Sequence, residues 1–132
     1  MMNPASEDIK DLLAAESSLA LTFATNLFIA KMPIDPDLCV SVNDTGGYDP
    51  EVDYVYDRPT VQIQVRGPKG DYIVGHELAQ DIGETIHGVN NQTVNATRYI
   101  GIWREGDVIA LGFDDNDRPL FSINFRIHRT DT

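Results

Sequence analysis

The sequence predicts an α+β fold: a single domain over residues 1–132, with a mostly antiparallel sheet of about five to six strands and two flanking helices. The chain has 132 residues, of which 42% are apolar, enough for one domain with a sizeable core. Several segments alternate apolar and polar residues, whereas one segment has the spacing of an amphipathic helix. Because the strands come in runs, the predicted order is α-β-β-β-α-β-β-β.

The first half of the chain is predicted to hold one helix and three strands. Ser6 is expected to cap a short helix that ends near Glu16, since acidic residues follow it in the first turn. The stretch 19–32 is rich in Leu, Phe, Thr and Ile and favours a strand. Alternation predicts two further half-buried strands, over 38–42 and 61–65, joined by a long acidic loop over 43–59.

The second half contains the most periodic segment of the chain. Val74, Leu78, Ile82 and Ile86 recur every four residues and predict an amphipathic helix that Gly88 ends. Three strands are predicted after it, over 93–104, 108–113 and 120–129. Turn-forming residues separate them, so hairpin connections are expected.

Charge and cysteine content exclude several classes of function. Ten basic residues stand against 21 acidic ones, a formal net charge of -11, so the surface as a whole cannot neutralise nucleic-acid phosphates. The single cysteine, Cys39, has no partner for a disulfide and is expected to be a core thiol. An acidic N-terminal segment and the lack of a long apolar run predict a soluble intracellular product without a membrane span.

The segment HELAQDIGETIH, residues 76–87, is a candidate for a metal site. It begins like the zinc-protease signature H-E-x-x-H, but Gln80 stands where the second histidine must lie. This polar helical face is therefore predicted to be solvated, and a zinc hydrolase using His76, Glu77 and His87 is a weaker alternative. We predict no catalytic, metal-binding or cofactor-binding residues.

The segment FDDNDRPLF, residues 113–121, raises the possibility of a calcium site. A calcium-binding EF-hand loop that started at Asp114 would place Arg118 at a ligand position and Pro119 where a glycine is required. The segment is therefore predicted to be a hairpin turn, for which Asp and Asn are well suited. A small acidic calcium- or ligand-binding module stays as the alternative function.

Four segments together resemble a known family. They are VSVNDTGGYDP (40–50), RPTVQIQVRG (58–67), TRYIGIWREGD (97–107) and LGFDDNDRPLFSINFRIHR (111–129). Their residues and order are similar to the bacteriophage minor capsid and tail-terminator family, whose members act in tail completion and head-tail joining. The resemblance covers nearly the whole chain.

The resemblance implies a structural virion protein without enzymatic activity. It implies a homo-oligomer, typically a hexameric ring, that caps the tail tube at the phage neck after assembly in the host cytoplasm. The implied partners are the tail-tube protein and a head-completion or connector protein. DNA would pass through the lumen without specific binding, and no membrane is involved.

Acidic and tyrosine-rich segments supply the candidate interface or lumen residues, because carboxylates repel phosphates and tyrosines favour interfaces. Ordinary solvation of these acids is the alternative. Trp103 is expected in the core, with an interface role as its alternative. The candidate residues are Asp44, Tyr48, Asp49, Glu51, Asp53, Tyr54, Tyr56, Asp114, Asp115 and Asp117.

Overall fold

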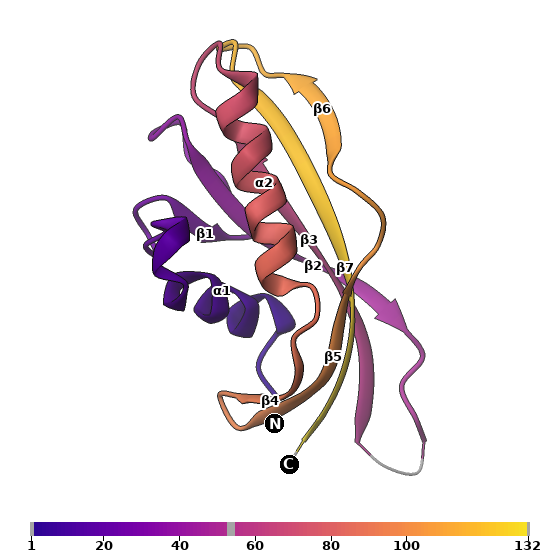
Figure 1. Cartoon of the computed structure of the whole chain (residues 1–132). Helices are drawn as coiled ribbons and strands as arrows, with labels where there is room; N and C mark the ends of the chain where they lie inside the picture. Colours follow the sequence, from indigo (N-terminus) through magenta and orange to yellow (C-terminus); the bar gives the residue numbers. More distant parts are fainter. Residues whose placement is uncertain (1, 53–54, 132) are drawn as a thin grey trace.

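The computed structural model describes residues 2–52 and 55–131 (Figure 1). The predicted α+β class and the order of elements are confirmed. One predicted strand, over 93–104, is a hairpin of two strands. In chain order, the elements are α1 (Ala5–Ala15), the short 3-10 helix η1 (Ser17–Leu19), β1 (Leu27–Ile29), β2 (Cys39–Tyr48), β3 (Tyr56–Arg66), α2 (Tyr72–Ile86), β4 (Asn90–Val94), β5 (Thr97–Arg104), β6 (Ile109–Phe113) and β7 (Pro119–Asp131).

One mixed sheet organises the molecule, in the order β1-β2-β3-β7-β5-β4. Strand β7 lies at its centre and pairs antiparallel with β3 along one edge. Its other edge is divided, because β6 pairs with its first residues and β5 with its last. All these pairings are antiparallel, as are those of β2 with β3 and of β4 with β5, whereas β1 runs parallel to β2.

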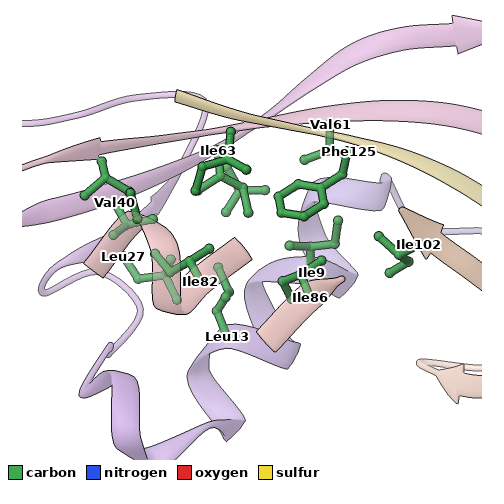
Figure 2. Packing of buried hydrophobic residues seen from close by; sticks show 14 of the residues in the cluster. Ile9, Leu13, Leu27, Val40, Val61, Ile63, Ile82, Ile86, Ile102 and Phe125 are labelled. Atoms are coloured by element: carbon green, nitrogen blue, oxygen red, sulfur yellow. The ribbon is translucent and has the colours of Figure 1, made fainter. Parts of the chain in front are cut away.

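Both helices pack on the same face of this sheet (Figure 1). The inward side chains of β7 alternate as Phe121, Ile123, Phe125 and Ile127, all fully buried. Figure 2 shows the sheet residues of this core facing the side chains that the helices contribute. The alternation predicted from the sequence therefore decides which face of the sheet carries the core.

Helix α1 is fixed to the sheet by polar groups. The expected cap at Ser6 is wrong: the helix begins at Ala5, and Ser6 lies inside it. The carboxylate of Asp44 in β2 accepts hydrogen bonds from the Ser6 backbone N–H at 3.0 Å and from its hydroxyl at 2.6 Å. Further along, the Tyr99 hydroxyl donates to the buried Asp8 carboxylate. Burial, together with this bond to Asp8, raises the pKa of Tyr99, so its phenol stays protonated.

Two other expectations are corrected in the strands. The expected loop over 43–59 is mostly a hairpin, since β2 continues to Tyr48 and β3 begins at Tyr56. A glycine pair at 46–47 lies within β2, at an irregularity in its pairing with β3. The expected strand over 19–32 is reduced to β1, three residues long.

Helix α2 shows why a four-residue repeat did not predict every buried position. Ile82 and Ile86 are buried as expected, but Val74 is 39% exposed. The first turn instead buries Gly75, where an added Cβ atom would lie 2.8 Å from the Phe121 ring and 3.0 Å from the Gly67 Cα atom. A glycine is needed because the helix backbone approaches the sheet this closely.

Replacing Gly75 by alanine should therefore destabilise the protein, by about 1–3 kcal/mol, because the new methyl group overpacks the contact with the sheet. Gly83→Ala is the matched control, since its Cβ would meet mainly the flexible Arg104 side chain at 3.1 Å. There the higher helix propensity of alanine should stabilise the protein by up to about 1 kcal/mol. Chemical unfolding measures both, and equal effects would contradict the packing explanation.

Candidate assembly surfaces

The predicted site residues lie in two groups at opposite ends of the sheet (Figure 1). One group belongs to the β2–β3 hairpin, where Tyr56 faces Thr130 near the end of β7. The other belongs to the turn between β6 and β7, next to Pro119 at the start of β7. A strand of this length spans about 40 Å. The acidic segments therefore do not form one common site.

The hairpin group is held by side-chain contacts. The Arg58 guanidinium donates to the Asp49 carbonyl oxygen at 2.6 Å and lies 3.3 Å from the Glu51 carboxylate. The Tyr56 hydroxyl lies 2.9 Å from His128 Nδ1. Tyr48 is 55% exposed and available to a partner. Two further residues of this group, Asp53 and Tyr54, lie outside the described residues, and Asp44 accepts the hydrogen bonds from Ser6 described above.

The turn between β6 and β7 is a hairpin corner, as predicted. Asp114 Oδ1 accepts hydrogen bonds from the backbone N–H groups of Asn116 and Arg118, at 2.9 and 3.0 Å. Its Oδ2 lies 2.9 Å from Arg118 Nε. Desolvation opposes ionisation, but these donors outweigh it and lower the pKa of Asp114. Asp115 and Asp117 are exposed.

Two buried arginines, Arg66 and Arg118, hold the loop before β2, a role that the sequence did not indicate. Arg66 is 4% exposed and donates to the carbonyl oxygens of Asp37, Pro33, Ile34 and Pro36, at 2.9, 2.6, 3.2 and 2.7 Å. Arg118 donates to the Ile34 carbonyl oxygen as well. The loop therefore depends on arginines of β3 and of the β6–β7 turn, while the Ile34 side chain is 73% exposed at its surface.

Strand β6 is an exposed apolar edge, and the sequence did not indicate this. Ile109, Leu111 and Phe113 are each about half exposed, at 46, 49 and 51%. Pairing places Ile109 opposite Ser122 and Phe113 opposite Pro119, so apolar groups occur on both faces. The Phe113 ring lies 6.5 Å from that of Tyr72 in the first turn of α2. The missed signal is the run IALGF, which carries no charged residue.

A second free edge lies on the opposite side of the sheet. In β2, strand β1 pairs with Val40, Ser41 and Val42. Within residues 2–52 and 55–131, the outer edge of β2 beyond this point, over 43–48, has no strand beside it. β6 likewise pairs only with β7 there. The sheet thus ends in an open strand on either side.

The face of the sheet without helices carries an aromatic and basic cluster. Trp103 is 37% exposed, so the expectation of a core residue is wrong. Its ring contacts His128 edge-on at 4.9 Å, and the Arg126 guanidinium lies over it at 5.2 Å. Burial, together with the nearby Arg126 and Arg58, lowers the pKa of His128.

Among the described residues, no group of three or more His, Cys, Asp or Glu side chains could hold a metal ion. His76 stacks on Tyr72, and His87 Nδ1 accepts a hydrogen bond from the Arg104 backbone N–H at 3.0 Å. Cys39 is buried, as expected, and burial raises the pKa of its thiol. In the part of the chain that the structure describes, no helix is long and apolar enough to cross a membrane.

Comparison with known proteins decides the family. The model of a family described as bacteriophage tail terminator protein matches residues 7–131. The chain belongs to the bacteriophage tail terminator family. It is therefore a structural phage tail protein, a component of the virion, and its family is not one of enzymes. No curated protein matches the chain.

Two solved structures share the fold of this tail terminator family member. One is a chain described as the virion of a native gene transfer agent particle, with a TM-score of 0.75 and 14% identity. The alignment covers 95% of this chain and 93% of that one. A second structure has a TM-score of 0.50, 15% identity and coverage of 94% and 90%. At these identities, the comparison shows a common fold.

Replacing Arg66 by methionine should loosen the loop over 33–37, because its carbonyl oxygens lose a buried donor. We expect a loss of about 1–3 kcal/mol in unfolding free energy and faster proteolysis within this loop. Arg98→Met is the control. Arg98 is exposed, and its guanidinium donates to the side chain of Asn91 in β4 and not to the loop. If Arg66→Met were cleaved faster at other sites while cleavage within the loop kept its wild-type rate, the assignment would be contradicted.

His128 should make stability depend on pH. Because its folded pKa is lowered, the unfolded chain binds the proton more readily, and stability is complete only above the unfolded pKa of 6.5. The unfolding free energy should fall as pH decreases from 6.5 and level off below the folded pKa. Comparing the wild type with His128→Gln over this range isolates the effect. A constant difference between the two proteins would contradict it.

Proposed function

We propose that this protein is a ring-forming tail terminator that caps the finished tail tube and joins it to the neck of the particle. The observation that carries the proposal is the family match over residues 7–131. The exposed apolar β6 edge supports it, because an apolar edge strand left in solvent promotes association with other chains. The protein acts by binding, without catalysis.

In this proposal, copies of the chain form a hexameric ring around a lumen through which DNA passes without specific binding. One end of the ring meets the tail-tube protein, and the other meets a head-completion or connector protein. The exposed carboxylates at the two ends, Asp49, Glu51, Asp115 and Asp117, are candidates for surfaces along the lumen, where they would repel phosphates. A lumen lined instead by Arg98, Arg104 or Arg126 would contradict this part.

The proposed capping role is tested on cognate tails that were assembled without this protein. Without a cap the growing end of the tube stays open, so we expect tube lengths to be widely distributed in electron micrographs. Adding the purified, gold-labelled protein during assembly should narrow the lengths and place label at one end only. Label along the whole tube, or at neither end, would contradict the proposal.

A further inference from the structure

The open strand β6 differs from an ordinary protected edge. Strand β4, at one end of the sheet order, has the sequence NNQTV and is polar, which suits an edge in contact with water. Strand β6 has the sequence IALGF, and all five of its residues are exposed. Its composition therefore indicates a strand that another chain covers.

We propose that β6 of one copy pairs with the outer half of β2, residues 43–48, of the next copy, so that the sheet continues from subunit to subunit. This inference rests on the proposed ring and names the surfaces that build it. The occupant of the β6 edge is thus a second copy of the same chain. The two edges are different surfaces on opposite sides of the sheet, and such a heterologous contact forms a ring when its rotation closes.

The lengths and directions of the two edges match. β6 has five residues, and the free stretch of β2 has nearly the same length. β6 runs antiparallel to β7, β7 to β3, and β3 to β2, so β6 and β2 of one copy run in opposite directions. Rotation about a ring axis keeps these directions when the strands are inclined by less than about 45° to that axis. β6 therefore meets the next β2 antiparallel, the more stable arrangement.

The stagger of the two edges also fits a closed ring. β6 lies level with Pro119–Ser122 of β7, whereas the free part of β2 lies, across β3, level with residues 124–128. This offset of about five residues is roughly 17 Å along the strands. The four strands β2, β3, β7 and β6 are about 19 Å wide. The two lengths give a strand tilt of about 40°, within the range of about 35–45° in closed sheets.

Single cysteines on the two edges test this pairing. Leu111 in β6 is 49% exposed, Thr45 in the free part of β2 is also exposed, and the native Cys39 is fully buried. We would mix Leu111→Cys and Thr45→Cys proteins on tail ends and treat them with a short bismaleimide. The expected result is a cross-linked dimer that contains one of each variant. Each variant alone should give no cross-link.

Ile34→Cys is the matched control, since Ile34 is 73% exposed but lies on neither edge. It should not cross-link with either variant.

Ile109→Lys is a second test of the pairing. A charge on the β6 edge should prevent strand pairing and abolish tail binding, whereas the control Ile34→Lys should bind tails like the wild type.

The outcomes separate this inference from the proposed function. Variants that cap tails without cross-linking to each other would overturn the edge pairing and leave the capping role intact. Cross-links within a single variant would show a symmetric contact and would also overturn it. A wild-type protein that never binds tail ends would overturn the proposed function itself.

Discussion

Hydrogen bonding along both edges of β7 is the constraint on which the other elements depend. One edge of this thirteen-residue strand is filled by β3, and the other is shared by β5 and β6. Its alternating inward side chains also form the surface on which the helices pack. Because β5 occupies only the second half of that edge, β6 becomes a short outer strand with one open side. The proposed assembly surface thus follows directly from how β7 is paired.

Sequence patterns predicted the elements in which apolar residues recur at regular spacing. The alternation of 61–65 and 120–129 identified β3 and β7, and periodicity identified α2. The prediction of a loop over 43–59 was wrong. A glycine pair does not have to end a strand, because it can instead form an irregularity in the pairing of that strand. The segment 93–104 contains a turn at Asn95 and Ala96, with positive φ angles of 49° and 65°. Asparagine suits such a turn but alanine does not, so the pair gave only a weak turn signal.

The candidate site residues were chosen because they lie close together in the sequence. The exposed surfaces of the folded protein depend instead on which strands pair with each other. Asp44 and Asp114 belong to acidic segments but are engaged within the chain, one with the first turn of α1 and the other with Arg118. Arg66 holds the loop before β2 through carbonyl oxygens about thirty positions away in the sequence. Residue types alone do not show such a contact. An open strand is recognised only once its neighbours in the sheet are known, so the predicted strand over 108–113 could not be identified as an edge beforehand.

The central claim is that copies of this chain close into a ring at the end of the tail through these two edges. An electron cryomicroscopy reconstruction of the tail end measures this most directly. The account predicts a closed ring in which the sheet runs without a break from β6 of each subunit to residues 43–48 of the next. A ring in which both edges face solvent, or a tail end without this protein, would contradict it.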